Sequence, residues 1–330
     1  MTAPPNPRRG LAILMLVLAT LYWGLSFPVI KSIVSLNRAL LPHAGSWFVA
    51  ASALMPRFAL GAAFMLAICG RRGARPRPRE TIQGLGIGAF ATAGTLLQTD
   101  GMQFTDASTS AFLTQFSAIL IPIWVAVRRR RNPGAVIWTC CGLVLAGVAI
   151  LGHFDWRTLR FGRGEWETLL CSLFYMGQIL LLADVGFAGN RPAPVTLVMF
   201  AVQAVAFTAL AASTAPNARA LWVPWHSAAW VGLTLALTVF CTISAFFIMN
   251  KWQPRITATE AGLIYCIEPV FASVLVLFLP ALISAAAGIS YANERATWGL
   301  LVGGGLVMVA NVLVQTRPAQ DASDSAGAKG

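Results

Sequence analysis

Residues 11–30 read LAILMLVLATLYWGLSFPVI, a run of twenty residues without a charged side chain. At a rise of 1.5 Å per residue, a helix of this length crosses the roughly 30 Å hydrocarbon core of a bilayer. The run is longer than the apolar region of a secretory signal peptide, and no small-residue cleavage site follows it. We therefore expect a first membrane-spanning helix that the mature protein retains.

The rest of the chain repeats this apolar pattern. Of its 330 residues, 57% are hydrophobic and 11% are charged, and the mean hydropathy is +0.69. A soluble domain carries roughly 25% charged residues, so the composition excludes a soluble enzyme. The apolar runs predict an all-α integral membrane protein with ten spans, at 11–30, 48–70, 82–99, 107–127, 134–152, 166–184, 194–214, 228–249, 258–280 and 297–315.

The formal net charge of +12 comes from 24 Lys and Arg against 12 Asp and Glu. The basic residues lie in short clusters between the apolar runs, and no basic surface interleaved with aromatic residues is visible, so we expect no nucleic-acid partner. If the N-terminus lies inside, 16 of the basic residues fall in inner segments and seven in outer ones. The positive-inside rule then places both termini in the cytoplasm.

No cofactor or metal is expected from the motifs. The six cysteines all fall inside predicted spans, where they are expected to pack as small core residues rather than form bridges or zinc sites. The three histidines lie in separate loops without the spacing of metal ligands. No Walker sequence is present, so direct drive by ATP is not supported.

A weak internal repeat divides the chain. Residues 106–113 align with 257–264 at a shift of 151, and residues 143–147 align with 306–310 at a shift of 163. The difference indicates a twelve-residue insertion in the outer connection between the last two spans. Because each half has five spans, the second half must enter the membrane from the opposite side, which makes an inverted repeat.

The repeat sets the expected organisation of the chain. We predict a cytoplasmic N-terminal segment at 1–10, a first five-helix repeat at 11–152, an outer connecting loop at 153–165, a second five-helix repeat at 166–316 and a disordered cytoplasmic tail at 317–330. Carriers that work by alternating access keep their binding site at the interface of such repeats, near the bilayer midplane.

An ordered series of short motifs resembles the ten-helix EamA-type members of the drug/metabolite transporter superfamily. The series comprises Trp23-Gly24, Arg57-Phe58, the segment 105–113, Pro122, the segment 143–147, Ala258-Thr259-Glu260-Ala261, Glu268-Pro269-Val270, Glu294-Arg295 and Gly303-Gly304-Gly305. The resemblance implies an inner-membrane carrier, often an exporter, for amino acids, other metabolites or toxic compounds. The chain departs from the family at Arg131, which stands where the repeat predicts a counterpart of Glu294. The resemblance therefore does not extend to a role that needs both acids.

Arg57 and Glu268 are the charged residues placed deepest in the predicted spans. A charge in hydrocarbon costs about 2.5–3.5 kcal/mol on insertion scales, so each is a functional candidate. Counted along the helices, they lie about 20 Å and about 15 Å from the inner surface, within reach of each other if their helices are neighbours. The alternatives are a structural ion pair or a snorkelling arginine on one hand, and contact with substrate or, at Glu268, with a coupling proton on the other.

Five further polar or aromatic residues are predicted near the midplane. They are candidates to line a substrate cavity, although each alone is also typical of helix packing: Trp23, Gln115, Tyr175, Gln178 and Tyr265. Other charged residues fall at predicted helix ends, where water and headgroups are expected to solvate them: Lys31, Asp100, Asp106, Asp184 and Glu260.

The sequence thus predicts a secondary transporter, with export as the expected direction, for small organic metabolites such as amino acids or toxic compounds. It is expected to act by alternating access in a bacterial-type inner (plasma) membrane, driven by a substrate gradient or by proton exchange. The alternative is an integral-membrane enzyme that acts on lipids. Such an enzyme needs His, Asp or Glu clustered at one membrane interface, and the sequence predicts no such cluster.

Overall fold

The computed structural model describes residues 8–71, 75–105, 110, 113–130, 134–151, 162–293 and 298–315. Every regular element in these residues is a helix, as predicted. Most of the predicted outer loop at 153–165, all of the tail at 317–330, Asp106, Arg131 and Glu294 lie outside the described residues.

Each of the ten predicted ranges contains helical residues. The first half of the chain forms α1 (Arg9–Leu40), α2 (Ser46–Arg71), α3 (Pro78–Gly101), α5 (Ser117–Arg129) and α6 (Ala135–Leu151). The second half forms α7 (Arg163–Leu182), α8 (Pro192–Thr214), α9 (Ala228–Ala236), the π-helix η4 (Leu237–Ser244), α10 (Ala245–Trp252), α11 (Ala258–Tyr265), α12 (Glu268–Leu275), α13 (Leu279–Ala287) and α14 (Trp298–Gln315).

Several of these helices meet the requirements for crossing a bilayer. Among the described residues, five helical segments are long and apolar enough by length and composition, namely α1, α2, α8, the stretch from α9 through Arg255, and the stretch from α11 through α12. Shorter apolar helices lie at Ser117–Arg128, Ala135–Gly147 and Leu301–Ala310.

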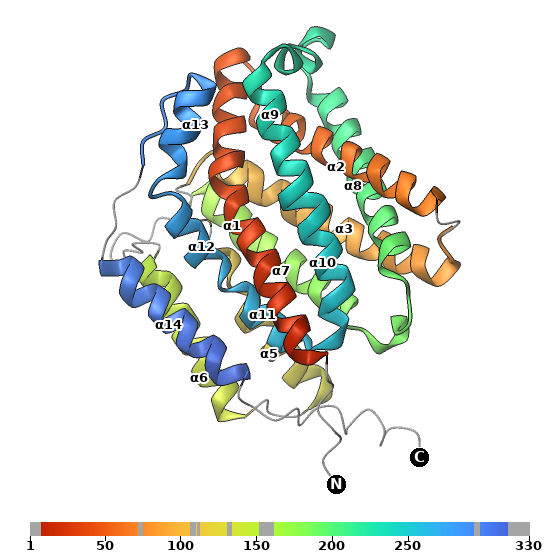
Figure 1. The fold of residues 1–330 in the computed structure, drawn as a ribbon, viewed down its shortest axis with the longest axis vertical. Coiled ribbons are helices and arrows are strands. Elements are labelled where there is room, and N and C mark those ends of the chain that lie inside the picture. The colour runs from red at the N-terminus through yellow and green to blue at the C-terminus, as the bar shows by residue number, and fades with distance from the viewer. Residues whose placement is uncertain are drawn as a thin grey trace.

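Helix α1 runs through the middle of the bundle (Figure 1). It contacts α2, α9, η4, α10, α11 and α12, while α2 packs along α8 and α3 packs against both α7 and α8. Helices α6 and α14 form a pair at one edge. They approach closely because Gly147 has no side chain: a Cβ atom there would lie 2.6 Å from the carbonyl oxygen of Gly303. Small residues at such crossings are typical of helix packing in membranes.

Two predicted spans are interrupted rather than continuous. A turn at Gln115 and Phe116 precedes α5, and a turn at Cys266 and Ile267 separates α11 from α12. The two interruptions coincide at the repeat shift of 151, because α5 begins at Ser117 and α12 at Glu268. Their backbone hydrogen bonds also correspond: the amide of Phe116 donates to Leu113 and that of Ile119 to Phe116, as that of Ile267 donates to Ile264 and that of Val270 to Ile267.

The structure divides the predicted span at 258–280 into α11 and α12. Pro269 has no N–H group for a bond to the carbonyl of Tyr265, which favours a new helix start at Glu268. Beyond this span, the predicted twelve-residue insertion is not an open loop, because the helix α13 occupies much of it.

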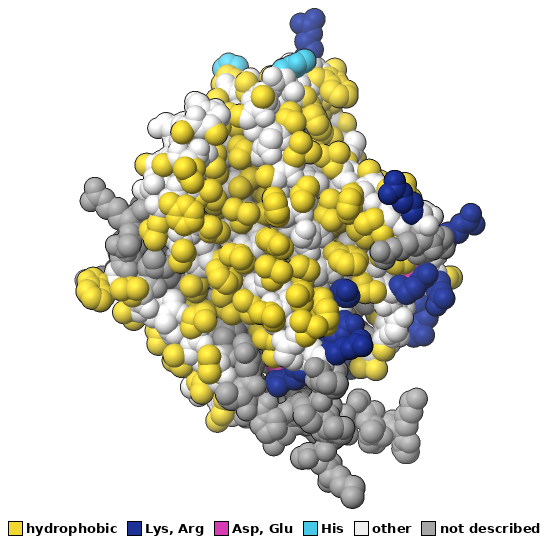
Figure 2. Space-filling model, viewed as in Figure 1, with side chains coloured by type: hydrophobic (Ala, Val, Ile, Leu, Met, Phe, Trp, Pro, Cys, Tyr) yellow, Lys and Arg dark blue, Asp and Glu magenta, His cyan; other side chains and the backbone are white. Residues whose placement is uncertain are grey.

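The surface separates apolar and basic regions. Hydrophobic side chains cover most of the face in Figure 2, whereas Lys and Arg gather toward the bottom and lower right. We call this the basic end; it contains the start of α1, α3 and α8 and the end of α10. Exposed side chains such as Leu66, Trp124 and Leu301 suit contact with lipid.

Candidate functional site

Arg57 is buried in the bundle, with 3% of its surface exposed. Its Nε atom donates a hydrogen bond to Oγ1 of Thr242 at 2.8 Å, and its guanidinium lies 4.8 Å from the centre of the Phe58 ring. Thr242 belongs to the π-helix η4, and its hydroxyl donates to the carbonyl of Leu237, five residues earlier. The π-helix of one half thus orients the arginine of the other, and such segments frequently occur at functional sites.

Glu268 is the first residue of α12 and is half-buried between fully buried neighbours. The sequence raised the possibility of a pair with Arg57, but no ion pair joins the two among the described residues, and Arg57 is instead bonded to Thr242. Thr242 belongs to η4 and Glu268 to α12, and both of these elements pack against α1. Arg57 and Glu268 therefore belong to one region of the bundle without neutralising each other directly.

Tyr175 belongs to a chain of side-chain hydrogen bonds that ends beside Gln115. The hydroxyl of Tyr175 donates to Oε1 of Gln98 at 2.9 Å, and Nε2 of Gln98 donates to Oγ1 of Thr114 at 3.3 Å. Gln115 directly follows Thr114 at the helix interruption and is buried. The chain connects α7, α3 and the segment before α5 at the level of the broken helix.

Trp23 and Gly24 place α1 against the second interrupted span. The Trp23 ring packs edge-on against Phe246 and Tyr265, with ring centres 5.5 and 5.2 Å apart. A Cβ atom on Gly24 would lie 2.9 Å from the backbone nitrogen of Ala272 and 3.2 Å from the carbonyl oxygen of Glu268. This close approach brings Trp23, Tyr265 and Glu268 into one neighbourhood.

Tyr265 and Gln178 make packing contacts in this structure. The hydroxyl of Tyr265 donates to Oε1 of Gln253 at 2.8 Å, and Nε2 of Gln253 donates to the carbonyl of Ile179 at 2.8 Å. Nε2 of Gln178 lies 3.7 Å from the sulfur of Met249, a weak contact. The two hydrogen bonds link α11 and α7 to the short 3-10 helix η5 (Gln253–Arg255) that follows α10. A role for Tyr265 and Gln178 in a cavity stays a prediction.

Sequence reasoning missed three polar side chains of this region: Thr242, Gln98 and Gln203. Gln203 lies in the middle of α8, is fully buried, and has no hydrogen-bond partner on either amide atom within the part of the chain that the structure describes. A signal for it was present in the sequence, because an amide stands alone in the apolar run LVMFAVQAVAF at 197–207.

Charged residues at helix ends are more buried than predicted. Asp100 is 1% exposed, because Arg163 binds its carboxylate at 2.5 Å. At the other end of the bundle, Arg9 binds Glu260 at 2.5 Å. The prediction that water solvates these two acids is therefore wrong in part. Of the remaining residues predicted there, Asp184 accepts a bond from the amide of its neighbour two residues on.

Glu80 forms the most fully bonded ion pair of the basic end. Its two carboxylate oxygens accept bonds from Nε and Nη2 of Arg191 at 2.7 and 2.8 Å. The Arg191 guanidinium is the main cause that lowers the pKa of Glu80 to about 2. The pair joins the start of α3 to the start of α8.

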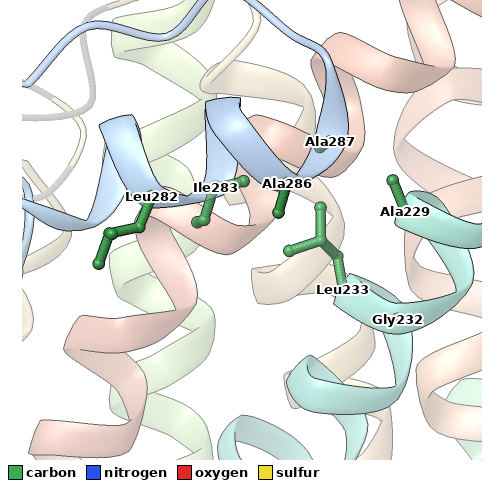
Figure 3. Close-up of a pocket in the computed structure, with 7 residues that line it drawn as sticks. All are labelled: Ala229, Gly232, Leu233, Leu282, Ile283, Ala286 and Ala287. Carbon is green, nitrogen blue, oxygen red and sulfur yellow. The ribbon is translucent and has the colours of Figure 1, made fainter.

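A separate hollow of about 320 Å³ lies between α9 and α13 (Figure 3). Its lining is aliphatic, with side chains such as Leu233 and Ile283. None of the described residues that line it carries a charged or hydrogen-bonding side chain, so this hollow does not match the polar region around Arg57.

Comparison with known proteins agrees with this architecture. Residues 10–152 match the model of the EamA-like transporter family. The resemblance to the EamA-type transporters that the sequence motifs indicated is therefore confirmed over these residues. The EamA-like segment contains Trp23, Arg57 and Gln115, and the family is one of transporters rather than enzymes. This similarity argues against the alternative of an integral-membrane enzyme that acts on lipids.

Two further similarities extend beyond the EamA-like segment. An "Uncharacterized transporter" of Archaeoglobus fulgidus is 26% identical over 271 residues, which cover 80% of this chain and 77% of that protein. A crystal structure of a protein is similar in fold, with a TM-score of 0.67 and 16% identity over 93% of this chain and 96% of that one. The chain is a multi-pass membrane protein with similarity to transporters.

Proposed function

We propose that the protein is a secondary transporter that exports small organic solutes by alternating access, with both termini in the cytoplasm. The observation that carries this proposal is that Arg57 and Glu268 are charged residues without ion-pair partners in the described part of the bundle. Both lie deep in helices of different halves, and neither has a protein counter-ion among the described residues. An uncompensated charge in a membrane is costly, so a transported solute or proton is its natural partner.

The packing of the helices supports an inverted repeat. If α1, α2 and α3 correspond to α7, α8 and the α9–α10 segment, then the contact of α3 with α7 corresponds to that of α10 with α1. The contact of α5 with α7 likewise corresponds to that of α12 with α1, and that of α3 with α8 to that of η4 with α2. The coincident interruptions before α5 and α12 add to this support, because carriers of this kind bind solutes at broken helices near the midplane.

Two ion pairs connect the halves at opposite ends. Arg9 at the start of α1 binds Glu260 of the second half, and Arg163 at the start of α7 binds Asp100 of the first. In alternating access, one end must open while the other stays closed. We assign the Arg9–Glu260 pair to the state in which the basic end is closed. The Arg163–Asp100 pair is assigned to the state in which the opposite end is closed.

The substrate chemistry follows from the two unpaired charges. The guanidinium of Arg57 suits an anionic group of the solute. The carboxylate of Glu268 suits a cationic group or a coupling proton. A small zwitterion satisfies both charges at once, which fits amino acids among the expected metabolites.

The proposal is tested by comparing metabolites of cells that express the chain with those of cells that lack it. Solutes that accumulate without the protein are then followed as labelled compounds in liposomes that contain the purified protein. We expect flux without nucleotide, and at least tenfold less flux for Arg57→Gln. Flux that requires nucleotide inside the liposomes would contradict a secondary transporter.

A proton role for Glu268 has its own test. We expect Glu268→Gln to retain exchange of solute across the membrane but to lose the response to an imposed pH gradient, because the amide carries no titratable proton. The comparison is the ratio of flux with and without the gradient in wild type and variant. An equal ratio in both proteins shows that Glu268 does not couple protons.

A further inference from the structure

Gln203 is unusual among the buried amides of the bundle. It is 0% exposed, yet neither Nε2 nor Oε1 has a hydrogen-bond partner within the described part of the chain. Gln253 is equally buried, but its amide both donates to Ile179 and accepts from Tyr265. Native proteins rarely leave a buried amide unsatisfied, and a functional role or a bound water or ion is a recognised reason.

Gln203 lies at the depth of Arg57. The ring of Phe58 packs against both Phe200 and Phe207 of α8, with ring centres 5.9 and 5.5 Å apart. Gln203 is three residues after the first and four before the second, so all three share one face of the helix. Because Arg57 directly precedes Phe58 and lies over its ring, the amide and the guanidinium occupy the same layer of the α2–α8 interface.

Arg57 also has unused donors. Only its Nε forms a hydrogen bond in the described structure, to Thr242, which leaves the two terminal nitrogens without a protein acceptor. These nitrogens form the fork that binds a planar carboxylate with two parallel hydrogen bonds. The amide of Gln203 supplies one more donor group and an acceptor.

We propose that Gln203 and Arg57 together form a binding position for the carboxylate group of the transported solute. The arginine supplies the charge, and Nε2 of Gln203 donates a further bond to a carboxylate oxygen. Oε1 of Gln203 then accepts a bond from a hydroxyl or amine next to that carboxylate. This assignment rests on the proposed transport function and adds a contact from α8 to the site.

Stability without solute separates a binding residue from a structural one. In Gln203→Met, the unpaired amide is replaced by an apolar side chain of similar size, so the melting temperature of the purified protein should stay the same or rise. The matched control is Gln253→Met, which breaks two observed hydrogen bonds and should lower it. A decrease for Gln203→Met as large as that of the control overturns the proposal, because it shows that Gln203 is bonded within the protein.

Binding is measured by thermal-shift titration with propionate and benzoate, with inorganic phosphate and propylamine as probes of different chemistry. We expect the carboxylates to raise the melting temperature of the wild type and to bind roughly tenfold more weakly to Gln203→Met, and at least as weakly to Arg57→Gln. Equal carboxylate affinity in wild type and Gln203→Met overturns the proposal. So does a wild type that responds only to phosphate or propylamine, or to no probe.

The titration also separates this proposal from the transport function. Labelled-solute flux in liposomes is measured on the same preparations. Carboxylate binding that depends on Gln203, without any flux, would overturn the transporter proposal and leave the binding position in place. Flux together with unaltered carboxylate binding in Gln203→Met would overturn the binding position and leave the transporter proposal in place.

Discussion

At the scale of single residues, the buried arginine depends on one hydroxyl. Arg57 has a single observed hydrogen bond, to Thr242, and the same hydroxyl donates to its own π-helix. The donated bond fixes the direction of the oxygen lone pairs, and these fix the plane of the guanidinium. A hydrogen bond to a charged group is worth about 1.5–3 kcal/mol, so its loss should change the orientation of Arg57.

We therefore expect Thr242→Val to reduce the initial rate of solute exchange by about tenfold or more, since about 1.4 kcal/mol corresponds to a factor of ten. Thr242→Ser retains the hydroxyl and should stay near the wild-type rate. Thr139→Val is the control, because that exposed hydroxyl on α6 bonds only to the backbone of its own helix. Wild-type exchange in Thr242→Val, together with an inactive Arg57→Gln, would show that the orientation by Thr242 is unnecessary.

At the scale of helices, the contact between α1 and α12 depends on Gly24. A methyl group there meets the Cβ atom of Phe271 at 2.7 Å and the backbone nitrogen of Ala272 at 2.9 Å, so the helices must separate. We expect Gly24→Ala to lower the free energy of unfolding by about 1–3 kcal/mol, the usual cost of overpacking. Melting in detergent measures this, with Gly142→Ala as control because its methyl group meets no atom within 4 Å. Equal melting temperatures would contradict the tight crossing.

The pair between Glu80 and Arg191 makes the junction of α3 and α8 sensitive to acid. Because the folded-state pKa of Glu80 is about 2, below its usual value near 4.5, the pair stabilises the fold fully above the usual value. This contribution is lost as the pH falls toward 2. Glu80→Gln should therefore be less stable than wild type at pH 7, and the difference should shrink on acidification. Melting curves from pH 7 to 3 that stay equally far apart would contradict this.

The helices were easier to predict than their interruptions. Long apolar runs predict spans because the bilayer requires internally bonded helices, and each of the ten predicted ranges contains helical residues. The turn at Cys266 and Ile267 could be suspected from Pro269, but the matching turn at Gln115 and Phe116 has no proline beside it. Of the residues around Arg57, the sequence indicated the arginine itself but not its partner Thr242. Thr242 faces Arg57 because it lies in a π-helix, and an apolar run does not reveal where the helical register changes.

At the scale of the whole molecule, the two halves are joined by one arginine at each end. Arg9 begins α1 and Arg163 begins α7, which are corresponding helices if the repeat holds, and each binds an acid of the other half. Both pairs are closed in this structure, so both ends of the bundle are held across the halves. Alternating access then requires the pairs to open one at a time, which makes the balance between them a property of the entire molecule.

This balance can be shifted from either end. Glu260→Gln removes the pair at the basic end, and Asp100→Asn removes the other. Partly exposed pairs contribute up to about 1 kcal/mol, so each change should shift the ratio of open to closed ends by roughly fivefold.

The reporter of this shift is Cys241, which is 0% exposed and adjoins Thr242. It is kept as the sole cysteine of the protein and labelled with a maleimide that does not cross the membrane. In oriented vesicles, Glu260→Gln should speed labelling from the side of the basic end and Asp100→Asn from the other side. Labelling that increases equally from both sides in each variant would show that the pairs only stabilise the fold, because a gate changes access from one side alone.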